Sequence, residues 1–233
     1  PDETPAAPHP DFVGYAAYRA AGGYQLAAAV ARGDKDPDEL IKQMEDSGLR
    51  GLGGAGFPAG RKWHIVRNEP APRLMAVNID EGEPGTFKDR HYLERDPHRF
   101  LEGMLVAAWA VGIDRIWIYL RDEYHACRGA LEKEIALLRA DPPGPLPEIQ
   151  LRCGAGAYIC GEETALFNSL EGRRGEPRSK PPFPVTQGLF GKPTGINNVE
   201  TLVNVNLILG MGAPAYAALG TPGSTGTRLS CVS

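Results

Sequence analysis

The stretch Leu74–Gly85, LMAVNIDEGEPG, changes from apolar to acidic within a few residues. Its first half, Leu74–Ile79, has the length and the composition of a buried strand. Its second half carries Asp80, Glu81 and Glu83, together with glycines and a proline that favour a loop. This order predicts a strand whose carboxyl end runs directly into a polar loop.

Helical and strand patterns alternate after this first strand. Apolar positions recur at helical spacing over residues 101–112, and a second apolar run follows at Ile116–Leu120. Another helical pattern over residues 131–138 precedes a third apolar run at Ile149–Cys153, and Thr164–Leu170 again has a helical pattern. Because parallel strands need long crossovers, this order predicts an α/β fold, a Rossmann-like parallel sheet with helices on both faces.

The N-terminal part has a different pattern. Prolines dominate residues 1–10, as in a linker or arm. Asp36 and Pro37 then predict the N-cap and the first residue of a helix that ends at Ser47-Gly48. We therefore expect an N-terminal arm and a small helical lobe over residues 1–46, and a ligand-binding α/β domain over residues 47–233. The buried stripe of the predicted helix is Leu40, Ile41 and Met44.

A second capping pattern lies near the C-terminus. Asn197 is followed three residues later by Glu200, the spacing of a capping box. This pattern predicts a helix that begins at Asn197 as its N-cap and continues through Leu202, Val205 and Leu209.

Composition and charge exclude several classes of protein. Lys and Arg number 25 against 29 Asp and Glu, a net charge of −4, which argues against a general nucleic-acid binder. The longest apolar run, Met104–Ile113, is about half of the roughly 20 residues that cross a bilayer, so we expect no direct membrane insertion. Residues 1–10 do not resemble a signal peptide, which favours a cytoplasmic location, including the cytoplasmic side of a membrane complex. We expect free thiols and no metal site, because metal-ligand spacing is absent among the cysteines, Cys127, Cys153, Cys160 and Cys231.

Three loops are candidates for the ligand site, which in open parallel sheets lies at the carboxyl ends of the strands. The first is Gly51–Gly56, where four glycines in six residues expose backbone N–H groups, with Lys62 just beyond. Exposed amides and a nearby ammonium suit a phosphate group. The loop follows a helix end rather than a strand, which does not fit a dinucleotide fingerprint. A flexible turn between two lobes is the alternative interpretation.

The second candidate is the acidic loop after the first strand. Its carboxylates are costly to bring together unless hydroxyls, a ring N–H or a carboxamide donate hydrogen bonds to them. A solvated acidic turn is the alternative. A metal site is a further alternative, although no His lies at ligand spacing and the sequence fits no calcium loop.

The third candidate, Gly154–Thr164, follows the third strand and opens a helix, a context that favours a ligand at the helix N-terminus. Its acids, Glu162 and Glu163, alternatively just complement the helix dipole. Cys160 is either a catalytic thiol or, as free cysteines usually are, a small buried residue. The stiff, basic segment Arg178–Pro184 predicts either a grip on an adenine or a phosphate, or a rigid surface excursion.

Four segments in the same order resemble one family. They are SGLRGLGGAGFPAGRKW (Ser47–Trp63), VNIDEGEPGTFKDR (Val77–Arg90), GAGAYICGEETALFNSLEG (Gly154–Gly172) and KPPFP…GKPTGINNVETL (Lys180–Leu202). These segments look like the FMN-binding, NADH-oxidising flavoprotein subunit of respiratory complex I. They are also similar to the diaphorase subunits of NAD-dependent formate dehydrogenases and NAD-reducing hydrogenases. The resemblance runs from about Tyr15 to the C-terminus.

The resemblance implies an FMN-dependent NADH dehydrogenase, or diaphorase, module. Such a module transfers hydride between NAD(H) and FMN and passes electrons singly to the iron–sulfur subunits of a larger redox complex, including a thioredoxin-like [2Fe–2S] subunit. We expect no catalytic acid or base, because the cofactors carry the hydride chemistry. One alternative is a nucleotide-binding module without turnover. Another is a scaffold piece in which the glycine loops are only turns.

The resemblance also assigns residues. Phe57, Lys180 and Phe183 match positions that grip the adenosine half of NADH, and Glu83 and Glu163 match nicotinamide contacts. Leu52 stands where the family usually has Arg, so a cofactor contact from that side chain is not expected. The family continues into a ubiquitin-like region and a [4Fe–4S] domain that this chain lacks, so we expect a fragment. The implied cofactor-binding residues are Gly51, Gly53, Gly54, Lys62, Asn78, Asp80, Glu81, Glu83, Gly161, Glu162, Glu163, Asn197 and Asn198.

Overall fold

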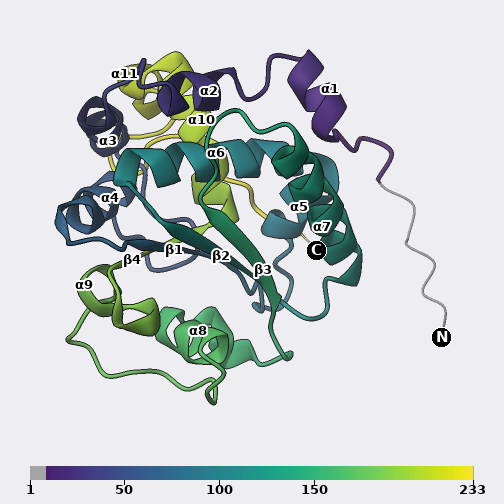
Figure 1. Cartoon of the computed structure of the whole chain (residues 1–233), viewed down its shortest axis with the longest axis vertical. Coiled ribbons are helices and arrows are strands. Elements are labelled where there is room, and N and C mark those ends of the chain that lie inside the picture. Colours follow the sequence, from purple (N-terminus) through teal and green to yellow (C-terminus); the bar gives the residue numbers. More distant parts are fainter. Residues whose placement is uncertain (1–8, 233) are drawn as a thin grey trace.

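The centre of the molecule is a four-stranded, all-parallel sheet in the order β3-β2-β1-β4, which appears in Figure 1 in a computed structural model. The structure describes residues 9–232, so residues 1–8 of the arm predicted over residues 1–10 lie outside the described residues. An α/β fold with a parallel sheet is thereby confirmed. The strands are β1 (Leu74–Ile79), β2 (Arg115–Leu120), β3 (Glu148–Cys153) and β4 (Thr194–Asn198).

Helices cover both faces of the sheet (Figure 1). One face carries α8 (Glu163–Leu170) and the short α9 (Pro184–Gln187), with the 3-10 turns η1 (Tyr158–Gly161) and η2 (Leu189–Gly191). The remaining helices lie around the other face and the ends of the sheet. They are α1 (Tyr15–Ala20), α2 (Gln25–Ala31), α3 (Pro37–Asp46), α4 (Ala59–Asn68), α5 (Lys88–Arg95), α6 (Pro97–Val111), α7 (His125–Ala140), α10 (Val199–Met211) and α11 (Ala213–Ala217).

The strand β1 is apolar almost throughout because both faces of the sheet are buried. Its alternate residues Met75, Val77 and Ile79 belong to the larger hydrophobic cluster, which includes α6 and α10. Leu74 and Ala76 point the other way, into the smaller cluster with residues of α8. Since successive side chains of a strand face opposite sides, a continuous apolar run is what a doubly covered strand requires.

The helices α6 and α10 pack closely across the main hydrophobic cluster. Nearly every residue of α6 is buried, and an added Cβ at its Gly103 would collide with the Leu202 carbonyl oxygen of α10. This contact requires a residue without a side chain on α6. No helix in residues 9–232 is both long and apolar enough to cross a membrane.

The helix α3 forms as its capping pattern predicts. Asp36 Oδ1 accepts a hydrogen bond from the Asp38 N–H at 3.0 Å, and the predicted stripe Leu40, Ile41 and Met44 is buried. These residues share one hydrophobic cluster with α6. The division of the chain at residue 46 stays a prediction.

The prediction that Asn197 caps α10 is wrong. Asn198 is the N-cap, and its Oδ1 accepts a hydrogen bond from the Glu200 N–H at 3.0 Å. Asn197 instead lies in β4, opposite Val77 of β1. The sequence pattern does not reveal β4 because TGINN is short and polar, and it is a strand only through its pairing with β1.

A buried polar network joins the residue that precedes α2 to α6 and α7. The Tyr24 hydroxyl donates to Nδ1 of His98 at 2.7 Å, and His98 Nε2 lies 2.8 Å from Oε2 of Glu134. All three side chains are almost inaccessible to solvent. Because Glu134 Oε2 also accepts from the Tyr15 N–H, this carboxylate ties the N-terminal helices to the rest of the molecule.

We expect His98→Gln to lower the free energy of unfolding by about 1–3 kcal/mol, because buried groups lose hydrogen bonds. Burial lowers the pKa of His98 from its ordinary 6.5, an effect opposed by Glu134. The unfolded chain therefore takes up a proton more readily, and wild type should lose stability as the pH falls through 6.5 and below. Urea unfolding at pH 7.5 and 5.5 measures both effects. A wild-type pH dependence equal to that of His98→Gln would contradict this account.

Candidate functional site

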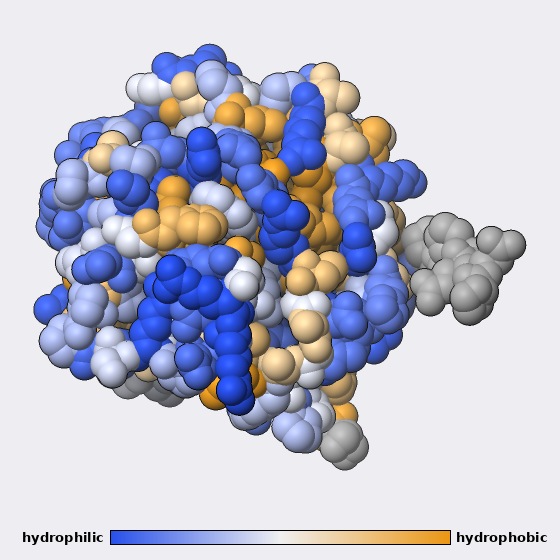
Figure 2. All heavy atoms as spheres, turned by 60° about the horizontal axis from the view of Figure 1, so that its bottom comes forward, coloured by the Kyte–Doolittle hydropathy of each residue, from blue (hydrophilic) through white to orange (hydrophobic). Residues whose placement is uncertain are grey.

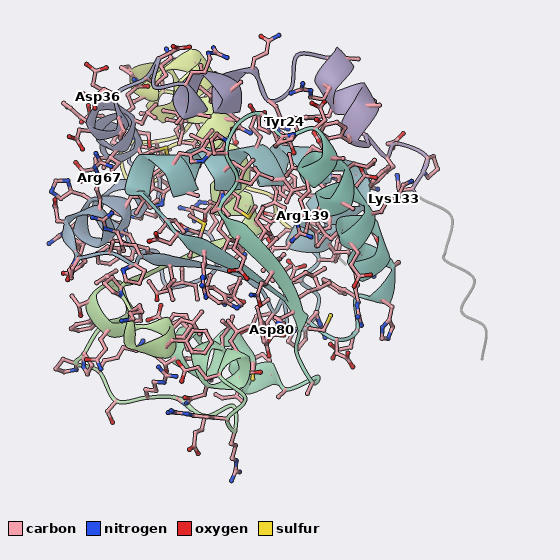
Figure 3. All side chains as sticks on the ribbon, in the orientation of Figure 1. Tyr24, Asp36, Arg67, Asp80, Lys133 and Arg139 are labelled. Carbon is pink, nitrogen blue, oxygen red and sulfur yellow. The ribbon has the colours of Figure 1, made fainter. Side chains whose placement is uncertain are left out.

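The loops that follow β1 and β3 meet at the carboxyl edge of the sheet. Figure 3 labels Asp80, just after β1, between the strand ends and α8. Asn78 Nδ2 donates to the Gly161 carbonyl at 2.9 Å, which joins the acidic loop to the third loop. An added Cβ at Gly161 would lie only 3.3 Å from the Asp80 carbonyl oxygen. The structure thus brings together Asn78, Asp80 and Gly161.

The glycine loop lies against the start of α10 at the same edge. The Gly51 N–H donates to the Phe57 carbonyl at 2.9 Å, and the Leu52 N–H donates to Oγ1 of Thr201 in α10 at 2.9 Å. A Cβ at Gly53 would lie 3.2 Å from Cβ of Asn198. Gly54 has a φ of +114°, which disfavours any other residue. The loop therefore places Gly53 beside Asn198, and at Gly54 it has a backbone conformation that larger residues would disturb.

Lys62 and Asn197 lie on two adjacent elements, α4 and β4. Lys62 Nζ donates to the Ile196 carbonyl at 2.7 Å, and the Trp63 indole N–H donates to Oδ1 of Asn197 at 3.3 Å. Burial lowers the pKa of Lys62, and the carboxylate of Glu163 opposes this effect. A partly buried ammonium of this kind favours a bound anion, which would stabilise its proton.

Two buried polar atoms at this edge have no hydrogen-bond partner among the described residues, Asp80 Oδ2 and Asn197 Nδ2. Burial raises the pKa of Asp80 to about 6, although Arg121 opposes the shift. An unsatisfied buried polar group costs about 1–3 kcal/mol, so each unpartnered atom indicates a missing partner. One is an acceptor and the other a donor, which fits a polar ligand that presents both kinds of group.

The acids that open α8 form ion pairs with Lys180. Lys180 Nζ lies 2.7 Å from Glu163 Oε1 and 3.2 Å from Glu162 Oε1. Glu162 is also the N-cap, because its Oε2 accepts the Thr164 and Ala165 N–H groups at 2.9 Å. Glu162 therefore has a structural role at the helix start. Glu163 forms an ion pair with Lys180, and its negative charge also raises the pKa of Lys62.

Glu81 and Glu83 have different surroundings although they are only two positions apart. The Glu81 carboxylate is buried and accepts from the Asp89 and Arg90 N–H groups, at 2.9 and 3.2 Å, and from the Tyr124 hydroxyl at 3.0 Å. These bonds cap α5 and leave Glu81 directed into the protein. Glu83 is exposed, and its carboxylate accepts from the Tyr158 hydroxyl. Glu83 is thus the residue of the two that solvent or a ligand reaches.

The predicted adenosine contacts, Phe57 and Phe183, are both exposed. Phe57 precedes α4 and Phe183 precedes α9, two helices that contact each other. A hollow of about 580 Å³ also lies on the α8–α9 side, which Figure 2 turns toward the viewer. Phe167 and Phe190 line it, together with Arg178, Ser179, Pro182 and Pro184 of the segment for which an adenine or phosphate contact is one of the two predictions. None of the residues that the resemblance assigns to a cofactor lines it.

Sequence reasoning did not assign several residues that hold the site together. Thr201 anchors the glycine loop and Tyr158 binds Glu83, while Lys88 and Asp89 contact Asn198. All four lie inside the quoted motifs, but the motifs alone do not reveal their roles, because their polar contacts involve distant segments. Among residues 9–232, no group of three His, Cys, Asp or Glu side chains is arranged to hold a metal ion.

The chain is similar to known redox proteins. An NADH-quinone oxidoreductase subunit of Aquifex aeolicus is 48% identical over 220 residues, which cover 91% of this chain and 51% of that protein. The alpha subunit of the NAD-reducing hydrogenase HoxS of Cupriavidus necator is 48% identical over 203 residues, 83% of this chain and 34% of that protein. The chain thus spans about half the length of the first of these relatives.

Structural comparison agrees with the sequence similarity. The crystal structure of an NAD⁺-reducing [NiFe]-hydrogenase in the air-oxidized state matches with a TM-score of 0.78 at 48% identity, covering 86% of this chain and 35% of that chain. Residues 44–207 match the family model described as the Nuo51 FMN-binding domain, and this range includes every predicted site residue. The chain therefore belongs to the Nuo51 FMN-binding domain family.

Proposed function

We propose that this chain is the FMN- and NAD(H)-binding part of a larger redox complex, an NADH dehydrogenase (diaphorase) module. The observation that carries the proposal is a pair of buried atoms, Asp80 Oδ2 and Asn197 Nδ2, that have no hydrogen-bond partner among the described residues. Both lie at the edge of the sheet where the glycine loop lies. When bound, FMN supplies the chemistry that accepts hydride from a nicotinamide and releases electrons singly. The protein residues hold and orient the two cofactors.

The phosphate of FMN fits the end of the site formed by the glycine loop, Lys62 and Asn197. This phosphate carries about two negative charges, which backbone N–H groups and an ammonium stabilise. The Lys62 ammonium has three donors and gives one of them to the Ile196 carbonyl, so it can also donate to an anion. Because a Cβ added at Gly53 would lie only 3.2 Å from Cβ of Asn198, the loop approaches the start of α10 closely and leaves little room for a side chain there.

Carboxylates surround the other end of the site, where we place the flavin ring and the nicotinamide. Asp80, Glu83 and Glu163 are acceptors suited to a ring N–H, to ribityl hydroxyls or to a carboxamide. Lys180, which forms an ion pair with Glu163, lies three residues before Phe183 in the chain, and Phe183 offers an exposed aromatic face to an adenine. These groups orient the rings for transfer and need not move a proton.

The assembly and location are part of the same proposal. The relatives are subunits of an NADH-quinone oxidoreductase and of an NAD-reducing hydrogenase, which supports partner subunits in general. We propose that iron–sulfur subunits, including a thioredoxin-like [2Fe–2S] subunit, receive the electrons on the cytoplasmic side of the complex. A [4Fe–4S] domain is expected in the part of the relatives' length that this chain does not span.

Purification of the chain with FMN, followed by anaerobic addition of NADH, tests the function. We expect a yellow protein whose flavin absorbance bleaches when NADH is added. A flavin that binds but does not bleach would favour a nucleotide-binding module without turnover. A chain that binds no flavin would favour the scaffold interpretation and contradict the proposal.

Gly53→Leu should weaken FMN binding at least tenfold. The new side chain must enter the space beside Asn198, where even a Cβ lies 3.2 Å away. Gly129→Leu is the matched control, since a Cβ there meets nothing within 4 Å. Quenching of flavin fluorescence gives both dissociation constants. Equal retention of FMN by the two variants would contradict the assignment of the glycine loop to FMN binding.

Glu163→Gln and Glu83→Gln should lower kcat/KM for NADH by roughly tenfold while FMN stays bound, because a neutral amide makes weaker hydrogen bonds than a carboxylate. The control is Glu132→Gln, which removes a carboxylate from a surface ion pair on α7. Steady-state NADH oxidation with an artificial acceptor, together with flavin content, separates the two effects. NADH kinetics like those of the control would exclude these carboxylates as nicotinamide contacts.

A further inference from the structure

A buried network of charged groups joins the start of α5 to the start of α10. Lys88 Nζ lies 2.8 Å from Asp89 Oδ1, 3.0 Å from Asn198 Oδ1 and 3.2 Å from Glu200 Oε2. Asn198 Nδ2 donates to Asp89 Oδ2 at 2.6 Å. Nothing in the proposed mechanism requires Lys88 or Asp89 to touch a cofactor.

The network allows the Asn198 amide one orientation. Its Oδ1 accepts from two groups that only donate, the Lys88 ammonium and the Glu200 N–H. Its Nδ2 donates to the Asp89 carboxylate, which only accepts when ionised. A flipped amide would place donor against donor and oxygen against carboxylate, so both sides of the amide fix the same rotamer.

The charges of the network depend on Lys88. Asp89 and Glu200 are both buried, and their carboxylates share the Lys88 ammonium. Burial raises the pKa of Asp89 to about 6, while Lys88 acts in the opposite direction and Glu81 adds to the shift. Removal of Lys88 would leave two buried carboxylates without this cation, which is strongly unfavourable.

The acidic loop holds one side of the network in place. The Glu81 carboxylate accepts the backbone N–H of Asp89 at 2.9 Å and so holds the first turn of α5. On the opposite side, a Cβ added to Gly53 of the glycine loop would lie 3.2 Å from Cβ of Asn198 and 3.9 Å from its Nδ2. A path of hydrogen bonds therefore runs from the acidic loop through Asp89 to Asn198, which lies beside the glycine loop.

We propose that Lys88 and Asp89 are positioning residues of the flavin site, which hold the Asn198 side chain in the orientation on which the glycine loop rests. This inference rests on the proposed function. The inference gives the two asparagines different roles. Among the described residues Nδ2 of Asn197 has no partner and can donate to the ligand, whereas Nδ2 of Asn198 already donates to Asp89. The acidic loop segment thus shapes the phosphate end of the site from a distance.

The experiment is a fluorescence titration of the flavin-free chain with FMN. Lys88→Met and Asp89→Asn should each raise the dissociation constant roughly tenfold, the effect of about 1.4 kcal/mol. Arg90→Met is the matched control on the same helix, since Arg90 pairs on the surface with Glu94 and should leave FMN affinity unchanged. Asp89→Asn keeps the shape of the side chain, and it carries the test if Lys88→Met does not fold.

A double-mutant cycle separates positioning from general destabilisation. In an Asn198→Ala background, Lys88→Met should add less than a twofold change in FMN affinity, because its effect passes through Asn198. Equal fold-changes in both backgrounds, or wild-type affinity in Lys88→Met and Asp89→Asn, would overturn this inference alone. A wild-type chain that binds no FMN would overturn the proposed function, and this inference with it.

Discussion

The pairing of β1 with β4 is the interaction on which the site depends. The two strands are parallel and in register, with Asn78 opposite Asn198, so both end at the same edge of the sheet. The acidic loop leaves β1 at this edge, and α10 begins there directly after β4. Segments that lie more than a hundred residues apart in the sequence are thereby held within hydrogen-bond distance.

Because these segments converge, several carboxylates lie near one another, and most of them have a hydrogen-bond or ion-pair partner of their own. Glu81 caps α5, Glu162 caps α8, Glu163 pairs with Lys180, and Asp89 pairs with Lys88. Asp80 differs, since one of its oxygens is buried without a partner in the described part of the chain. A site that satisfies most of its polar groups internally leaves a small set for a ligand, and that set contains both donors and acceptors.

The sequence predicts the elements of this fold better than their assembly. Strand β1 and helix α3 follow from strong local signals, an apolar run and a capping residue that precedes Pro37. Strand β4 gives no such signal, because its residues form a strand only when β1 lies beside them. The capping pattern points to Asn197 instead of Asn198 because Glu200 stands three residues after Asn197, the spacing of a capping box, although the helix does begin at this place in the chain.

The site, like the fold, is predicted by the sequence in its parts but not in its contacts. The motifs indicate which residues belong to the site, but their roles depend on contacts that only the fold reveals. Glu81 resembles its neighbours Asp80 and Glu83 in sequence, yet its carboxylate is fully bonded inside the protein. Lys88 is an ordinary lysine in the sequence, and its meeting with Asn198 depends on the sheet.

The most direct test of the central claim is an experimental structure of the chain loaded with FMN. The account predicts electron density for the phosphate between the glycine loop and Lys62, with the ring system toward Asp80. Flavin density on the outer side of α8, or an edge of the sheet that stays free of flavin at saturating FMN, would contradict it.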